Sequence, residues 1–224
     1  MNIKNICITA AIIMLSATEA MAQWRLGATV GASCNKLSID TQYQYDWRYD
    51  TRWGAQAGVA AQYDVTSWMG VRAELNFQQK GYTMRRTENK TTGELYRYRD
   101  NYLSLPLMAS FSFGGQKVRG FVNAGVYGGY WLYSHTKGYS EDLLTEGTGY
   151  VDSEVELTGK HDQRLDFGYV GGVGVEYRVS RHWAAQVEAR YYHSVVSKKK
   201  QYQAMKDYQY NSTLGLTAGV FYVF

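Results

Sequence analysis

The last eleven residues of the chain alternate between apolar side chains and small or polar ones. Every second position from Leu214 to Phe224 is apolar, and threonine or glycine occupies positions 213, 215, 217 and 219. Because successive side chains of a strand point to opposite faces, this segment predicts a strand with one wholly apolar face. A final strand of this kind is typical of a closed barrel in lipid, where the last strand pairs with the first and leaves no edge unsatisfied.

Seven further segments show the same period of two. Pro106 interrupts one of them, and because proline cannot donate a ladder hydrogen bond we expect a bulge there. The repeated alternation predicts an all-β fold, an eight-stranded antiparallel up-and-down transmembrane β-barrel. The seven segments cover residues 24–33, 52–65, 71–78, 103–113, 122–132, 165–178 and 183–192.

The connections between these segments alternate in length. Short turns are expected at 65–68, 114–117 and 179–182, and long loops at 36–50, 84–100, 136–162 and 196–210. Short turns on one side and long loops on the other are typical of outer-membrane barrels, whose short turns lie in the periplasm. The pattern therefore predicts that both ends of the barrel domain are periplasmic.

Composition agrees with a barrel although the average hydropathy does not suggest a membrane protein. The mean hydropathy is −0.41, but a strand with one lipid face and one interior face cancels its own average. The chain holds 21 Tyr, 6 Trp and 23 Gly with a single Pro, which favours strands and aromatic belts at the membrane interfaces. The net charge is only +4, and we expect no nucleic-acid partner.

The N-terminus has the layout of a secretory signal peptide. Lys4 precedes an apolar run over residues 6–15, and Ala20-Met21-Ala22 is a small-x-small cleavage pattern. The run is too short for a retained membrane helix. We therefore expect a cleaved signal peptide over residues 1–22 and one barrel domain over 23–224. Cys34 is then the only cysteine, so the role of its thiol stays open between a passive strand residue and a reactive group.

Several stretches of the chain together resemble a known family. The resemblance covers the whole of residues 23–224 and is to the small outer-membrane β-barrel domain family of Gram-negative bacteria, the porin-family or PorT-like outer-membrane proteins. It implies an integral outer-membrane barrel, with functions that run from structural and adhesive roles to parts of secretion machinery. The motifs specify fold and insertion, so Tyr222 and Phe224 are expected to form the signal read by the barrel-insertion machinery. The stretches are Tyr102-Leu103-Ser104-Leu105-Pro106-Leu107, the glycine-rich strand 167–177 and the ending 219–224.

The residues expected to point into the barrel decide whether it conducts. An eight-stranded barrel is narrow enough for side chains to fill it, and here they include bulky Tyr127 and Trp131. Opposite charges confined in such a space should pair, because an unpaired buried charge is costly. We predict a side-chain plug, with a narrow channel for small solutes or ions as the alternative. The predicted charge network is Arg25, Arg72, Glu74, Asp166, Glu176, Glu188 and Arg190.

No catalytic, cofactor or metal constellation is evident. His193 and Ser194 are adjacent, but neighbouring strand residues face opposite sides, so this pair cannot act together. No His, Asp or Glu cluster has ligand-like spacing. We therefore predict a non-enzymatic protein without a cofactor, and keep a lipid-modifying or proteolytic enzyme as a third possibility.

The expected loops hold the candidate binding residues. The aromatic residues at alternate positions suit contact with a partner or glycan, or cross-strand packing in a hairpin above the membrane. The acidic stretch 137–162 lies between two basic ones, so we predict that it pairs with them and that the remaining cations contact lipopolysaccharide phosphates. Further partners are membrane lipids and other envelope or secretion proteins. The candidates are Tyr43, Tyr45, Trp47 and Tyr49, and the cations Arg85, Arg86, Lys198, Lys199 and Lys200.

Overall fold

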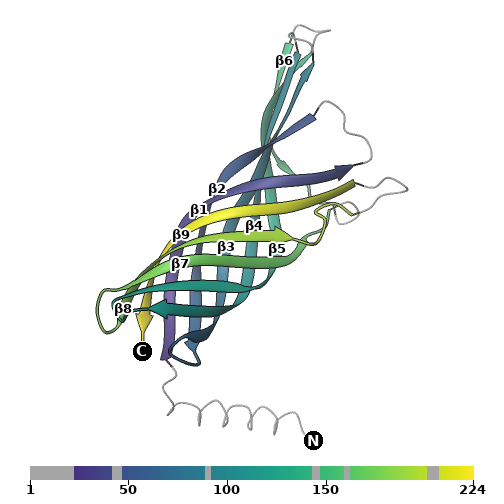
Figure 1. The fold of residues 1–224 in the computed structure, drawn as a ribbon. Helices are drawn as coiled ribbons and strands as arrows, with labels where there is room; N and C mark the ends of the chain where they lie inside the picture. The colour runs from purple at the N-terminus through teal and green to yellow at the C-terminus, as the bar shows by residue number, and fades with distance from the viewer. Residues whose placement is uncertain (1–22, 42–46, 89–91, 143–146, 159–161, 201–206) are drawn as a thin grey trace, which may run out of the picture.

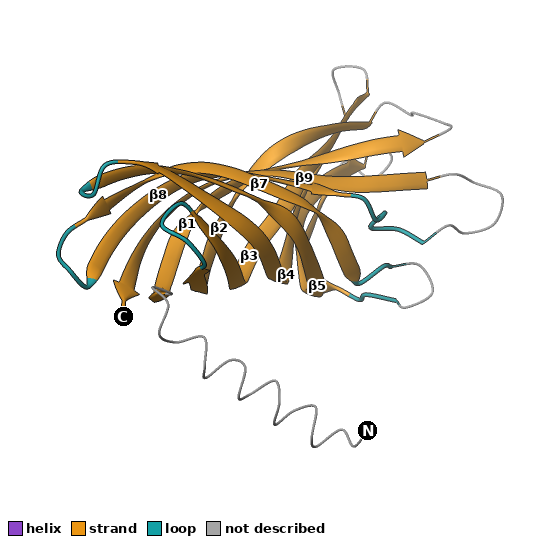
Figure 2. Ribbon diagram, turned by 60° about the horizontal axis from the view of Figure 1, so that its bottom comes forward, coloured by secondary structure: helices purple, strands orange, loops and turns teal. Residues whose placement is uncertain are grey.

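A computed structural model describes residues 23–41, 47–88, 92–142, 147–158, 162–200 and 207–224. Strands make up nearly all of this part (Figure 2), and within it no helix is long and apolar enough to cross a membrane. The predicted signal peptide lies outside the described residues. The strands are β1 (Gln23–Thr41), β2 (Trp47–Asp64), β3 (Met69–Glu88), β4 (Thr92–Gly114), β5 (Val118–Asp142), β6 (Gly147–Val155), β7 (Leu165–Arg178), β8 (Trp183–Ser194) and β9 (Asp207–Val223).

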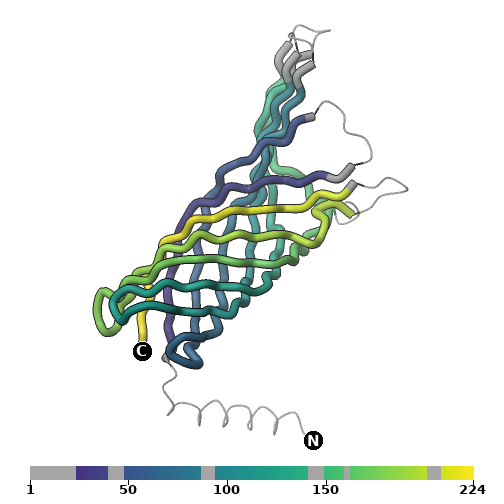
Figure 3. Tube along the Cα trace, in the orientation of Figure 1, coloured from purple at the N-terminus to yellow at the C-terminus, as the bar shows by residue number. Residues whose placement is uncertain are grey.

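Eight of the strands close into a ring. Each pairs antiparallel with its neighbours in the order β4-β3-β2-β1-β9-β8-β7-β5, and pairing of β4 with β5 completes the circle. β1 pairs with β9 from Arg25 opposite Val223 onward, as the alternating C-terminal segment predicted. The eight-stranded antiparallel barrel is therefore confirmed, and its strands run obliquely around the wall (Figure 3).

The long loops expected from the sequence are in large part strand. β3 and β4 continue as a hairpin to Glu88 and Thr92, and β5 continues to Asp142, where the extra strand β6 pairs with it alone. These parts project beyond the barrel as a narrow stalk (Figure 1). Both faces of the stalk are in contact with water, so its strands need no apolar face. Their backbone hydrogen bonds continue beyond the point where the apolar alternation ends, and the sequence pattern therefore does not predict them.

Two belts of exposed aromatic side chains place the barrel in the membrane. Ten residues of β1 separate Trp24 in one belt from Cys34, the partner of Trp53 in the other. That is about 33 Å along the strand, or about 25 Å along the membrane normal at a tilt of about 40°. This equals the height expected for a lipid-facing apolar band. The belts comprise Trp24, Trp68, Phe113, Tyr177, Trp183 and Phe224 at one end, and Trp53, Tyr130, Tyr133, Phe167, Tyr169 and Tyr191 at the other.

Three tight connections, at 65–68, 115–117 and 179–182, gather with residues 23 and 224 at what we call the short-turn end. Gly114 opens one of them with φ 112°, a conformation that residues with a side chain rarely adopt. Pro106 does not create a bulge: it pairs in register with Tyr127, and the irregularity lies at Asn101 and Tyr102 instead. Pro106 is buried and points into the barrel. Its missing N–H removes a ladder hydrogen bond, but the register of β3 and β4 is the same on both sides of it.

Candidate functional site: the barrel interior

The barrel interior is lined by charged and polar side chains. Along β8, outward residues are exposed and the alternate inward ones buried almost without exception. All seven charged residues predicted to point inward do so, and each is only 1–5% exposed. The inward aromatics Tyr127 and Trp131 are equally buried. The interior therefore holds a dense set of charges, and their pairing determines what the site can do.

Near the middle of the barrel, two arginines and two glutamates form a closed cluster. Arg190 lies 2.5 Å from a carboxylate oxygen of Glu74 and 2.5 Å from one of Glu188. Arg72 donates from Nε to Glu74 at 2.6 Å and lies 3.8 Å from Glu188. Asn76 also donates to Glu74 Oε2, and Asn123 donates to Glu188 Oε1, so both glutamates accept from charged and neutral donors.

The cluster continues toward the short-turn end. Gln186 accepts a hydrogen bond from Arg72 at 2.9 Å and donates one to Glu176 at 2.7 Å. Glu176 pairs with Arg25 at 2.6 Å, and Arg25 also pairs with Asp64 at 2.6 Å. We call this continuous set the arginine network; it consists of Arg25, Asp64, Arg72, Glu74, Glu176, Glu188 and Arg190.

Toward the other end, lysines replace arginines. Lys80 donates to Asp166 at 2.7 Å, and Asp166 also accepts from the Ser194 hydroxyl at 2.5 Å. Lys198 pairs with Asp100, which accepts from the Ser134 hydroxyl at 2.6 Å. We call Lys80, Asp100, Asp166 and Lys198 the lysine network. Lys80 and Asp100 were not among the predicted charges, although Lys80 continues the inward series of Arg72, Glu74, Asn76 and Gln78 at even positions.

An apolar and aromatic layer separates the two networks. Met108, Tyr127, Val170 and Tyr192 form a cluster of buried residues, with the Tyr127 and Tyr192 rings packed edge to face at 5.3 Å. Above them Tyr102 stacks on Trp131 with the ring centroids 5.8 Å apart. The layer contacts the lysine network directly, since the Lys80 ammonium lies 4.8 Å from the centroid of the Tyr102 ring and 5.0 Å from that of the Tyr127 ring.

A family model for the outer membrane protein beta-barrel domain matches residues 17–197. The chain belongs to this family. A barrel of the outer membrane of Gram-negative bacteria, with transmembrane strands, accounts for the closed ring, the two belts and the apolar band between them. A comparison of the chain with curated protein sequences found no match.

Several solved barrels are similar to this chain. Neisserial surface protein A (NspA) is 16% identical, with 91% of this chain and 99% of that one covered and a TM-score of 0.43. Ail, the attachment invasion locus protein of Yersinia pestis, is 12% identical, with 89% of this chain and 98% of that one covered and a TM-score of 0.43. OprG from Pseudomonas aeruginosa is 11% identical, with 91% of this chain and 95% of that one covered and a TM-score of 0.47. Membership of the family rests on the family model and not on these structures.

The predicted surface cations do not all lie on the surface of this outer membrane barrel. Lys198 is a correction to the sequence prediction: it is only 5% exposed and its ammonium lies 4.2 Å from the centroid of the Trp131 ring. Burial lowers the pKa of Lys198, and the neighbouring Asp100 opposes that change. A run of three lysines is typical of a solvent-exposed segment. Here the chain turns inward after β8, so that Lys198, the first of the three, forms an ion pair with Asp100.

The other predicted cations stay near the surface with partners of their own. Lys199 lies 2.7 Å from Asp162, the contact that joins the acidic stretch to a basic one. Arg85 pairs with Asp50 at 2.8 Å, and both side chains are nearly half exposed. Arg86 is half-buried and Lys200 is exposed.

The predicted aromatic candidates are only partly within the described residues. Tyr49 packs against Tyr82 with centroids 6.0 Å apart, which corresponds to cross-strand packing. Tyr43 and Tyr45 lie outside the described residues, as does the side chain of Trp47. Tyr222 packs edge to face with Trp183 and Phe224 in the belt at the short-turn end. Cys34 is a free thiol, half-buried in β1.

Histidines and carboxylates give no catalytic arrangement within the described residues. His193 is exposed on the outer face and contacts the Ser212 hydroxyl, while Ser194 points inward to Asp166. His135 and Lys137 both contact Asp152 on the stalk, and their hydrogen bonds hold the pKa of Asp152 below its usual value. No three His, Cys, Asp or Glu side chains in the described part are grouped so as to hold a metal ion.

Proposed function

We propose that this outer-membrane barrel is a non-enzymatic scaffold with a plugged interior. Both ends of the barrel domain face the periplasm, and the stalk and the loops beside it face outward and interact with envelope components or external partners. The orientation is supported by the short turns at the end that holds residues 23 and 224. The absence of a conducting path is supported by the interior side chains.

The burial of large interior side chains at successive levels carries the proposal. Arg72 and Arg190 in the arginine network, Tyr102 and Tyr192 in the aromatic layer, and Lys80 in the lysine network are all less than 2% exposed. A water-filled channel has to wet the side chains along its whole length. Since these residues come from different strands and different heights, they leave no continuous wet path between the two ends.

Conductance in planar bilayers tests the plug. Purified folded protein should insert without producing channels, because opening a path requires separating the buried ion pairs. Insertion is verified independently by adding a porin of known conductance to the same vesicles before fusion. Steady, voltage-independent channels of porin size from the wild-type protein alone would show that the plug proposal is wrong.

A second proposal concerns lipopolysaccharide, and a specific pair of cations favours it. Arg97 and Arg99 are exposed on the outward face of β4, and no partner of either guanidinium is present among the described residues. They lie opposite Lys137 and His135 on β5, whose ion-pair partner is Asp152. Arg97 and Arg99 are two residues apart and therefore share one face of the strand, where a bound anion could contact both guanidinium groups.

The height of these arginines suits a lipid phosphate. Arg99 is two residues from Asn101, the partner of the belt residue Tyr133, so it lies about 7 Å along the strand from the aromatic belt. Headgroup phosphates lie just outside such belts. We therefore expect Arg97 and Arg99 to contact lipopolysaccharide phosphates, in place of Lys198, which is buried.

Thermal stabilisation by lipopolysaccharide tests this contact. Added lipopolysaccharide should raise the temperature at which folded protein loses its fast-migrating gel band, and R97Q/R99Q should lose most of that rise. The matched control is R181Q, which removes an exposed arginine from a turn at the opposite end of the barrel. Equal stabilisation of R97Q/R99Q and wild type contradicts the proposal.

A further inference from the structure

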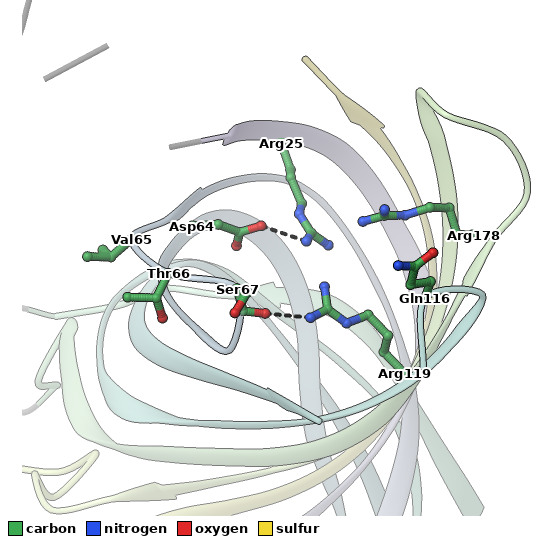
Figure 4. Close-up of a pocket in the computed structure, with 8 residues that line it drawn as sticks. All are labelled: Arg25, Asp64, Val65, Thr66, Ser67, Gln116, Arg119 and Arg178. Carbon is green, nitrogen blue, oxygen red and sulfur yellow. Dashed lines mark hydrogen bonds and ion pairs between the residues drawn. The ribbon is translucent and has the colours of Figure 1, made fainter. Parts of the chain in front are cut away.

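The short-turn end of the barrel contains a pocket of about 740 Å³. This volume lies within the range of small-molecule sites. Three arginines, Arg25, Arg119 and Arg178, line the pocket, and Asp64 is the only carboxylate among the described residues that line it. Figure 4 shows the three guanidinium groups directed into the same space from different strands. The pocket at the short-turn end of the barrel is therefore cationic.

Only one of the three arginines forms an ion pair with a described carboxylate. Arg25 lies 2.6 Å from both Asp64 and Glu176, so its charge belongs to the arginine network. Arg119 donates a single hydrogen bond to the backbone carbonyl of Ser67 and has no carboxylate partner in the described part. Glu176 lies directly opposite Arg119 in the pairing of β5 with β7. Asp64 and Glu176 thus offset two of the three positive charges, and the group of five keeps a net charge of +1.

Part of the hydrogen-bonding capacity of these arginines is also unused. The Nε atoms of Arg25, Arg119 and Arg178 are buried and have no acceptor among the described residues. The Arg178 guanidinium has neither a hydrogen bond nor an ion pair there. Buried donors without partners are costly, and native proteins rarely leave several at one place. A group that supplies acceptors to this pocket would remove that cost.

We propose that this pocket binds a phosphate group, as free phosphate or as a phosphate monoester, through Arg119 and Arg178. Phosphate carries a charge of about −1.5 to −2 at pH 7, which would offset the net positive charge of the pocket. Its oxygens accept paired N–H bonds in the geometry that arginine offers. The Gln116 amide and the Ser67 hydroxyl line the same pocket and add neutral donors. In the orientation proposed above the ligand arrives from the periplasm, but binding in solution does not depend on that orientation.

Calorimetric titration of the folded protein in a zwitterionic detergent tests the site. Inorganic phosphate, titrated at constant ionic strength, should bind saturably with one site per chain. R178Q should weaken binding roughly ten- to a hundredfold, the effect of losing a hydrogen bond to a charged group. Because Arg178 has no partner in the described part, R178Q should fold normally, which its heat-dependent gel migration verifies; R119Q is a second, independent variant.

The matched control is R181Q, which removes an exposed arginine from the adjacent turn outside the pocket and should leave phosphate affinity unchanged. Equal weakening by R178Q and R181Q, or a signal no different from that of chloride, would overturn the proposal. Glycerol 3-phosphate distinguishes the sources: tighter binding than phosphate assigns the site to esters, and equal binding assigns it to free phosphate. Citrate binding more tightly than both would overturn the choice of phosphate.

Discussion

Buried charge is neutralised differently at the two ends of the barrel interior. In the arginine network, Arg72 and Arg190 share Glu74 and Glu188, and all four residues are fixed on strands of the ring. In the lysine network each lysine has one carboxylate, and Lys198 follows β8 in a connection and not in a strand. We infer that the arginine network is a rigid part of the barrel wall. The lysine network closes the interior through Lys198, and this contact can open locally without unfolding of the barrel.

The physical difference lies in what a charge can do when its partner is removed. An arginine in the middle of a strand cannot reach water without unfolding the barrel, so a lost partner leaves a trapped charge. A lysine in a connection between strands can carry its ammonium to solvent. The arginine fork also forms paired bonds that a lysine cannot replace.

The largest effect is expected from Glu74→Ala. Arg72 and Arg190 would lose a shared carboxylate inside the membrane-spanning part, so the free energy of unfolding should fall by about 3–5 kcal/mol. Urea unfolding in detergent micelles, followed by tryptophan fluorescence, measures this. The control is Leu75→Ala, the next residue, which faces lipid and should cost much less. Similar losses for the two variants would contradict the rigid character of the arginine network.

A smaller and more local effect is expected from Asp100→Ala. Lys198 loses its carboxylate but can leave the interior, so the free energy of unfolding should fall by only about 1.5–3 kcal/mol, the value of one charged hydrogen bond. Trypsin should then cleave after Lys198 in folded protein, where wild type resists because the side chain is buried. The control is Asp162→Asn, which frees the half-buried Lys199 and should leave Lys198 protected. Resistance of Lys198 in Asp100→Ala would mean that this closure does not open.

The two networks also differ in how far the sequence could predict them. The arginine network lies on strands with strict alternation, where parity alone assigns Arg72, Glu74 and Arg190 to the interior. Lys80 and Asp100 lie where outward residues such as Gln79 have become polar, so the apolar signal that defines parity has ended. Extending the even-numbered inward series of β3 by one step would have identified Lys80.

Lys198 could not have been predicted from local sequence at all. Its burial depends on Asp100 and Trp131, which belong to strands far away in the chain. The run Lys198-Lys199-Lys200 has the composition of a solvated loop, and only the path of the chain after β8 brings its first member inside. The stalk was missed for a related reason: its strands are specified by pairing with neighbouring strands and not by an apolar face.

The smallest effect is expected outside both networks, on the stalk. Asp152 accepts hydrogen bonds from Lys137 and His135, and these hold its pKa below the usual value for Asp. A carboxylate whose pKa is lowered by folding contributes stability above its unfolded pKa, and that contribution disappears as the pH falls through the folded pKa.

Because the Asp152 carboxylate is exposed, only the local hairpin of β5 and β6 should respond to this change of pH. After correction for intrinsic rates, amide exchange in residues 134–142 should accelerate as the pH falls from about 5, which is about one unit above an ordinary Asp pKa, to values below that pKa. Asp152→Asn should exchange at the fast rate throughout, while β7 and β8 stay protected in both proteins; acceleration across the whole barrel would instead place the pH-sensitive group in the interior networks.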